Sequence, residues 1–371
     1  MALGAPPLLD FSCMLRNNPM GLGYGIKILI ALYSTAYYGT DEHAKSKLVD
    51  EVRKCCLHNG FFQIIGHRVP AELQEAVFKM SKTFFSLPQE SKDKASIETN
   101  TWYRGYEKKE SQILEAGTAP ELKEGYYLGD DLTRDHPYFI NKKLNSGPNM
   151  WPQDLSESEL EEFKSVSMRY YRMMHELARD VLVVLAKTLD LDSSYFDAFA
   201  KDAVATLRLL HYPPQPRDSD QKLTRGIGAH TDFGAITLLL QNEVDGLQVY
   251  EKATGEWLDV EPKKGAYVVN LGNMFMRWSN DKYISNLHRV INKSGRERYS
   301  VPFFFSGNPD YVVECLPNCR KEGEAAKYPS MTVQEAVGGS YNRSYLAARE
   351  YKKMAAPKKE NVVISTQAIT V

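Results

Sequence analysis

Two different hydrophobic patterns divide the chain near residue 200. Before that point, three long segments carry apolar residues at the spacing of a helix with one buried face. Pro70 suits the first turn of the second helix, and Ser156 with Glu159 forms a capping-box pattern before the third. A short apolar run between the first two helices predicts a strand. The predicted helices cover residues 43–59, 70–84 and 156–189, and the strand covers residues 61–65.

After residue 200 the pattern changes to short β-rich runs separated by turn residues such as Gly246, Gly255 and Gly265. Such a series predicts a mainly β fold with helical elaborations, built on a jelly roll. A final helix is predicted over residues 332–351. The predicted strands are residues 205–211, 236–241, 247–250, 257–260, 267–271, 288–292 and 299–306.

No linker precedes the β-rich part, so one catalytic core with additions is expected. Residues 1–200 are predicted to form an N-terminal mixed α/β region with the long helix. Residues 201–310 are predicted to form the jelly-roll core, and residues 311–371 a C-terminal strand and helix that pack on it.

Composition narrows the class of partner. The chain has 371 residues, 43% of them apolar, which is ample for a buried core, and a net charge of -1. Without a basic field, nucleic acid and anionic membranes are not expected partners. The start of the chain lacks the pattern of a secretory signal, and five cysteines suggest reduced thiols, so a cytoplasmic protein is expected. Cys315 and Cys319 have no second Cys/His pair nearby, which argues against a zinc site.

One segment does not fit the surrounding pattern. Residues 21–39 are apolar and rich in Gly and Tyr, but the uncharged run is too short for a membrane span. A surface insertion or a strand-like excursion is favoured over a peripheral membrane contact, and no stable membrane insertion is expected. The sequence does not indicate an oligomeric state.

Three residues form the strongest chemical pattern. His230 and Asp232 are two apart, so in an extended strand both side chains point to the same face. A jelly roll would bring His288 to them from a distant strand. Two imidazoles and one carboxylate form the facial triad that binds Fe(II) and leaves positions open for O2. An H-x-D pair and a lone His are also common without any metal, so the triad alone leaves both readings open.

A second pattern supports the metal reading. Arg298 and Ser300 are again two apart, on a strand whose apolar continuation predicts burial. A buried guanidinium needs an anion, and Arg with Ser could bind the remote carboxylate of a 2-oxo acid. Tyr212 is a candidate third donor.

Taken together, these motifs resemble the isopenicillin N synthase-like 2-oxoglutarate/Fe(II) oxygenases, in particular their fungal branch, over nearly the full chain. Residues 16–40 have no recognisable counterpart, so an insertion or a gene-model error is expected there. The matching motifs are Leu9-Asp10-Phe11, as the family's opening strand, Gly60-Phe61-Phe62-Gln63-Ile64, His67-Arg68-Val69-Pro70, Lys123-Glu124-Gly125-Tyr126-Tyr127, Gly147-Pro148-Asn149-Met150-Trp151-Pro152, Gly228-Ala229-His230-Thr231-Asp232-Phe233-Gly234, Gly246-Leu247-Gln248-Val249 and Asn286-Leu287-His288-Arg289-Val290.

The resemblance implies a double-stranded β-helix core, with Fe(II) on His230, Asp232 and His288. It implies 2-oxoglutarate bound by Arg298 and Ser300, and less securely by Tyr212. O2 would be the oxidant, with ascorbate a candidate reductant, and a small organic substrate would be hydroxylated, desaturated or cyclised. Specialised metabolism or small-molecule catabolism in a fungus is the expected setting. Substrate contacts are expected from the C-terminal helix and from Tyr103, Arg104, Tyr106, Phe303 and Phe305.

Two alternatives stay open at this point. An oxidase of the same fold could use O2 without 2-oxoglutarate, with Arg298 and Ser300 binding a substrate carboxylate. A barrel that binds a small molecule without catalysis is the other alternative, although the intact triad argues against it.

Overall fold

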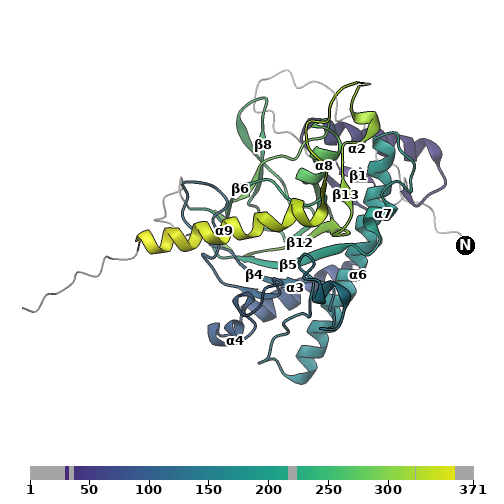
Figure 1. The fold of residues 1–371 in the computed structure, drawn as a ribbon. Helices are drawn as coiled ribbons and strands as arrows, with labels where there is room; N and C mark the ends of the chain where they lie inside the picture. Colours follow the sequence, from purple (N-terminus) through teal and green to yellow (C-terminus); the bar gives the residue numbers. More distant parts are fainter. Residues whose placement is uncertain (1–29, 33–36, 216–223, 322, 356–371) are drawn as a thin grey trace, which may run out of the picture.

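Strands from both halves of the chain join in one large sheet, against which helices and a smaller sheet pack (Figure 1). The computed structural model describes residues 30–32, 37–215, 224–321 and 323–355. Its helices are α2 (Glu42–His58), α3 (Ala71–Phe85), α4 (Gln89–Asp93), α5 (Pro137–Ile140), α6 (Glu157–Thr188), α7 (Asp197–Ala200), α8 (Asn273–Trp278) and α9 (Val333–Ala355). Its strands are β1 (Ile30–Leu32), β2 (Phe61–Ile65), β3 (Gly105–Glu107), β4 (Glu124–Leu128), β5 (Val204–Tyr212), β6 (Ile227–His230), β7 (Ile236–Gln241), β8 (Leu247–Glu251), β9 (Glu256–Asp259), β10 (Tyr267–Leu271), β11 (His288–Val290), β12 (Arg298–Gly307), β13 (Val312–Val313) and β14 (Met331–Thr332).

Two sheets form the jelly roll. The larger has the order β1-β2-β10-β7-β12-β5-β4-β3, and the smaller has the order β6-β11-β8-β9. Every pair in them is antiparallel except β1 with β2. Side chains of both sheets share one buried cluster, which places the sheets face to face. That cluster contains Phe61, Leu210, Tyr212 and Val268 of the larger sheet and Ile227, Leu247, Val249 and Val290 of the smaller.

Helices cover the other face of the larger sheet. The long helix α6 lies against β12. The ring centroids of Tyr171 and Phe303 are 5.4 Å apart, and those of His175 and Phe305 are 5.1 Å apart. Because side chains alternate along a strand, Arg298 and Ser300 point the opposite way, toward the smaller sheet. One strand therefore carries an apolar face for the helices and a polar face for the interior of the jelly roll.

The predicted elements are confirmed to within a few residues. The helix predicted from residue 156 begins where expected, and both hydrogen bonds of the capping box between Ser156 and Glu159 are present. The strands predicted over residues 236–241 and 267–271 match β7 and β10 in full. No helix in the described part of the chain is long and apolar enough to cross a bilayer.

The expectation for residues 16–40 is wrong where the structure describes them. Ile30–Leu32 is an edge strand that pairs in parallel with β2, and Tyr37 and Tyr38 both donate to Asp180 of α6, at 3.3 Å and 2.5 Å. These residues belong to the fold and are not an insertion. Residues 9–11, expected as the opening strand, lie outside the described residues.

Candidate metal centre and carboxylate-binding site

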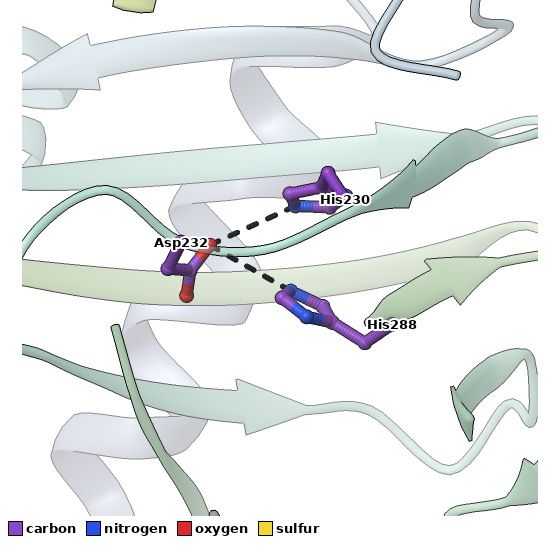
Figure 2. A group of neighbouring side chains, drawn as sticks. All are labelled: His230, Asp232 and His288. Atoms are coloured by element: carbon purple, nitrogen blue, oxygen red, sulfur yellow. Dashed lines mark ion pairs between the residues drawn. The ribbon is translucent and has the colours of Figure 1, made fainter. Parts of the chain in front are cut away.

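Three residues converge at one end of the smaller sheet (Figure 2). His230 ends β6, Asp232 follows two residues later, and His288 begins β11 directly opposite His230. The Nε2 atoms of His230 and His288 lie 3.7 and 3.6 Å from Oδ1 of Asp232. One ligand atom from each of the three residues lies within 4.8 Å of the other two, so the three residues could hold one metal ion.

Hydrogen bonds of the two imidazoles point their Nε2 atoms at the metal position. Nδ1 of His230 lies 2.8 Å from the carbonyl of Gly228, and Nδ1 of His288 lies 3.2 Å from that of Asn286. A carbonyl oxygen only accepts, so each Nδ1 carries the proton and each Nε2 keeps its lone pair. This is the tautomer that a metal ligand requires.

The two carboxylate oxygens of Asp232 have different partners. Oδ2 accepts hydrogen bonds from Thr237 at 2.5 Å and Asn270 at 2.7 Å, while Oδ1 faces the two histidines. Thr237 lies on β7 and Asn270 on β10, so the larger sheet orients a ligand carried by the loop after β6. Neither donor was predicted from the sequence.

The surroundings favour the protonation states of a ligand set. Burial, with the neighbouring His230, lowers the pKa of His288 to about 4, and burial lowers the pKa of His230. Burial alone would raise the pKa of Asp232, but His288, His230 and the two hydrogen-bond donors outweigh it and lower the pKa. At neutral pH the site therefore offers two neutral imidazoles and one carboxylate.

The second predicted group lies on the facing sheet. Arg298 is fully buried and pairs across the ladder with Tyr212, whose ring lies 4.7 Å from the guanidinium carbon. The Ser300 hydroxyl lies 3.4 Å from that of Tyr212, and Nη2 of Arg298 donates to Gln241 at 2.7 Å. No salt bridge joins Arg298 to a carboxylate in the described part of the chain. A buried cation with a neutral amide beside it suits a carboxylate ligand.

Several residues expected at the substrate site lie elsewhere. Phe303 and Phe305 face α6, and Tyr106 donates to Glu124 at 2.6 Å on the helix side of the sheet. Arg104 is buried and donates to the carbonyl of Asn145. The expectation for these four residues is wrong. For Phe303 and Phe305 the reason is that a continuous apolar run does not show which face of a strand looks inward.

Other side chains occupy the interior near the histidines. The guanidinium carbon of Arg208 on β5 lies 4.3 Å from the ring of Tyr127 and 4.7 Å from that of Phe304. The positive charges of Lys123 and Arg208 also act to lower the pKa of His230, beside the larger effect of burial. Tyr103, expected near the substrate, stacks on Tyr345 of α9 with ring centroids 6.0 Å apart.

A facial set of two histidines and one aspartate inside a jelly roll defines a mononuclear non-haem iron enzyme. Comparison with known proteins identifies the family within this class of enzymes. Residues 203–307 match the family model of the 2OG-Fe(II) oxygenase superfamily. Residues 30–154 match a second family model, described as "non-haem dioxygenase in morphine synthesis N-terminal". The chain belongs to the 2-oxoglutarate- and Fe(II)-dependent oxygenases.

Curated relatives and solved structures agree with this assignment. The chain is 56% identical to the 2-oxoglutarate-Fe(II) type oxidoreductase hxnY of Emericella nidulans, over 96% of this chain and 95% of the relative. It is 38% identical to the clavatol oxidase claD of Penicillium crustosum, over 81% and 92% of the two chains. A crystal structure of a full-length Neurospora crassa protein in complex with alpha-KG and thymine superposes with a TM-score of 0.73 at 28% identity, over 84% of this chain and 95% of that one. The enzyme class and its dependence on iron, 2-oxoglutarate and O2 are thereby established.

Proposed function

We propose that His230, Asp232 and His288 hold the Fe(II) and that Arg298, Ser300 and Tyr212 bind the remote carboxylate of 2-oxoglutarate. One observation carries the proposal. One ligand atom from each of the three residues lies within 4.8 Å of the other two, and the facing sheet carries a buried arginine that pairs with no carboxylate among the described residues. We infer that 2-oxoglutarate bridges the two groups, with its keto acid on the metal and its remote carboxylate on the arginine.

The residues of the chain have distinct tasks in the proposed reaction. Bound Fe(II) supplies the chemistry that couples the oxidative decarboxylation of 2-oxoglutarate by O2 to the oxidation of a substrate C–H bond. The carbonyls of Gly228 and Asn286 keep the imidazoles in the binding tautomer, and Thr237 and Asn270 keep one oxygen of Asp232 directed at the metal. Burial excludes water from the centre and strengthens the charge-assisted contacts.

The substrate of this centre is proposed to be a small organic molecule that is hydroxylated, desaturated or cyclised. Arg208 and Phe304 are expected to contact it, because they lie on the interior face of β5 and β12 and Phe303 and Phe305 do not. The names of the fungal relatives support a place in specialised metabolism or small-molecule catabolism. Ascorbate is proposed as the reductant that restores Fe(II).

The cellular setting and the domain division are proposed on weaker grounds. A net charge of -1 supports an enzyme that needs neither nucleic acid nor membrane insertion, and the free cysteines of the described residues support a place in the cytoplasm. Residues 201–310 are proposed as the catalytic core, with residues 1–200 and 311–371 packed on it. The larger sheet supports one continuous unit, since it takes β2 and β4 from the first part and β5 and β12 from the second.

Anaerobic addition of Fe(II) and then 2-oxoglutarate to the purified protein tests the proposal. A weak visible absorption band should appear only when both are present, and it should be absent in His230→Ala, Asp232→Ala and His288→Ala, because a facial triad has no spare ligand. Metal binding without the band would favour the oxidase that does not use 2-oxoglutarate. Failure to bind any metal would favour the non-catalytic barrel.

A further inference from the structure

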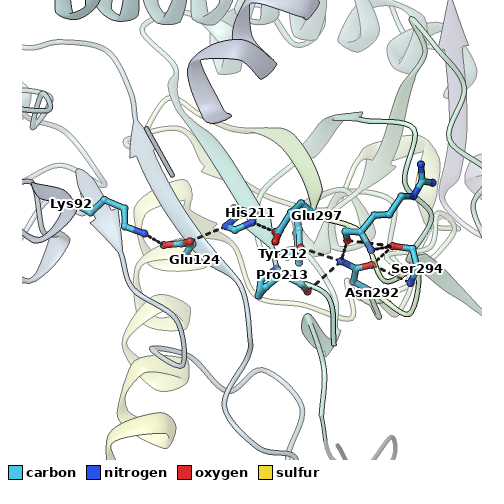
Figure 3. Close-up of polar contacts among 9 residues, drawn as sticks. Lys92, Glu124, His211, Tyr212, Pro213, Asn292, Ser294 and Glu297 are labelled. Atoms are coloured by element: carbon cyan, nitrogen blue, oxygen red, sulfur yellow. Dashed lines mark hydrogen bonds and ion pairs between the residues drawn. The ribbon is translucent and has the colours of Figure 1, made fainter. Parts of the chain in front are cut away.

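A row of charged side chains runs from buried Lys92 and Glu124 through His211 to the half-exposed Glu297 (Figure 3). His211 lies at its centre and has a carboxylate at each ring nitrogen. Nδ1 is 2.8 Å from Oε1 of Glu124, and Nε2 is hydrogen-bonded to Oε2 of Glu297. On the far side, Lys92 of α4 donates to Glu124 at 2.8 Å.

Two residues of this charged row directly precede, in the sequence, residues of the proposed carboxylate site. His211 comes before Tyr212, and Glu297 comes before Arg298. Across the ladder, Tyr212 pairs with Arg298 and His211 pairs with Tyr299. A bond between His211 and Glu297 therefore closes the end of the β5–β12 pair at the rung that holds the arginine.

The environment keeps the His211 ring in one place. Its ring stacks on Tyr299 with centroids 4.9 Å apart and lies 5.4 Å from Phe85 of α3. Glu124 is an ionised acceptor at this position: burial would raise its pKa, but His211, Lys92 and Tyr106 lower it to about 2. With a carboxylate at each ring nitrogen, the imidazole is held at two points.

A second set of hydrogen bonds holds the same end of the β5–β12 pair from its other side. The amide of Asn292, in the turn between β11 and β12, donates to the carbonyls of Tyr212 at 3.0 Å, Pro213 at 3.2 Å and Arg296 at 2.8 Å. Figure 3 shows this amide on one side of Tyr212 and the charged row through His211 on the other. The backbone that carries Tyr212 and Arg298 is thus held at both sides.

We propose that His211, bridged by Glu124 and Glu297, is a positioning residue that sets the register of β5 against β12 and so aims Arg298 and Tyr212 at 2-oxoglutarate. The inference rests on the proposed function of Arg298. It assigns the bridge no contact with iron, 2-oxoglutarate or substrate. Loss of the bridge should therefore weaken 2-oxoglutarate binding and leave Fe(II) binding as it is.

The test measures the dissociation constant of 2-oxoglutarate for the anaerobic Fe(II) enzyme from the visible band. Glu297→Gln is the main variant, because 53% of the Glu297 side chain is exposed and the change spares the core. It should raise the dissociation constant about tenfold, which is the loss expected when one charge-assisted hydrogen bond no longer supports the site. The Fe(II) dissociation constant and the melting temperature should stay near the wild-type values.

Four further variants complete the design. His211→Gln should weaken 2-oxoglutarate binding by a similar factor, and the double variant should be no weaker than His211→Gln alone, since both changes break one contact. Glu256→Gln, at the exposed start of β9, is the matched control and should bind like wild type. Arg298→Gln is the benchmark for loss of the carboxylate site.

Three results would overturn the proposal in distinguishable ways. If Arg298→Gln loses 2-oxoglutarate while Glu297→Gln and His211→Gln bind it normally, the positioning role is wrong and the site assignment stands. If Arg298→Gln itself binds 2-oxoglutarate normally, the site assignment fails and the positioning role fails with it. Additive losses in the double variant would also contradict a shared bridge.

Discussion

Single hydrogen bonds decide how the iron ligands of this chain are presented. Asp232 is carried by a loop rather than a strand, so its orientation depends on the two donors that hold Oδ2, Thr237 and Asn270. Outer partners of this kind typically change metal affinity by about 10–100-fold when removed. The geometry of the ligand set is therefore shared between the two sheets.

Asn270→Ala should weaken Fe(II) binding by about tenfold or more, because Asp232 loses one of the two bonds that keep Oδ1 directed at the metal. Anaerobic Fe(II) titration measures the effect. Asn308→Ala is a suitable control, since that amide donates to Lys201 at an exposed position away from the triad. Unchanged Fe(II) affinity in Asn270→Ala would show that Thr237 alone orients the carboxylate.

Arg298→Lys should weaken 2-oxoglutarate binding by about tenfold to a hundredfold, because Lys replaces a planar fork with a point charge. Lost charge-assisted bonds of about 1.5–3 kcal/mol each account for that range. Titration of the visible band measures it. If only the affinity for the organic substrate fell, Arg298 would bind substrate and the oxidase reading would gain.

At the scale of strands and helices, the sequence predicts most of what the structure shows, and its failures have a physical cause. The i, i+2 spacing of His230 with Asp232 and of Arg298 with Ser300 identifies inward-facing pairs because polar residues mark the interior face. The run after Ser300 has no such mark. β12 is buried on both faces and carries apolar side chains on both. The sequence therefore does not show whether Phe303 or Phe304 faces α6.

The outer donors to Asp232 escaped prediction for a related reason. Thr237 and Asn270 are single polar residues inside apolar strands, and their use depends on which strands become neighbours. Pairing of β10 with β7 places Asn270 opposite Thr237. Only the register of the folded sheet makes that juxtaposition visible.

Glu124 ties β4 to β5 and α4, and its contribution to stability should depend on pH. Its pKa falls from 4.5 to about 2 on folding, so the stabilisation is complete above about pH 4.5 and is lost as the pH falls through about 2. Glu124→Gln should cost about 3 kcal/mol of unfolding free energy at neutral pH. Urea unfolding at several pH values should show the gap to wild type closing between about pH 5 and pH 2. A gap that does not change with pH would mean that packing, not charge, sets the cost.

At the scale of the whole molecule, a short strand covers one edge of the larger sheet. Ile30–Leu32 covers the outer edge of β2, and β2 is the link between that edge and β10. Three residues are too few to show an alternating pattern, so the sequence left both an insertion and a strand-like excursion open for this segment. An edge strand still matters, because an uncovered edge exposes unpaired N–H and C=O groups to other chains.

Deleting residues 30–40 should therefore reduce soluble yield and melting temperature, since it uncovers β2 and removes the bonds of Tyr37 and Tyr38 to Asp180. Replacing the same residues with a Gly/Ser linker of equal length should have the same effect, which separates strand pairing from chain length. Size-exclusion chromatography and thermal unfolding measure both. A soluble deletion protein with wild-type 2-oxoglutarate binding would show that the edge strand is dispensable.

The pairing of His230 with His288 on one rung of the smaller sheet has a consequence for motion. An ion bound to both imidazoles cross-links β6 to β11, so these strands can separate only after the metal leaves. Metal at a hundred times its dissociation constant would then raise the free energy of that opening by about 2.7 kcal/mol. In hydrogen-exchange terms, the amides that pair β6 with β11 should exchange about a hundredfold more slowly when metal is bound. Those of β13 and β14, in a separate sheet, should be unaffected unless the whole molecule unfolds.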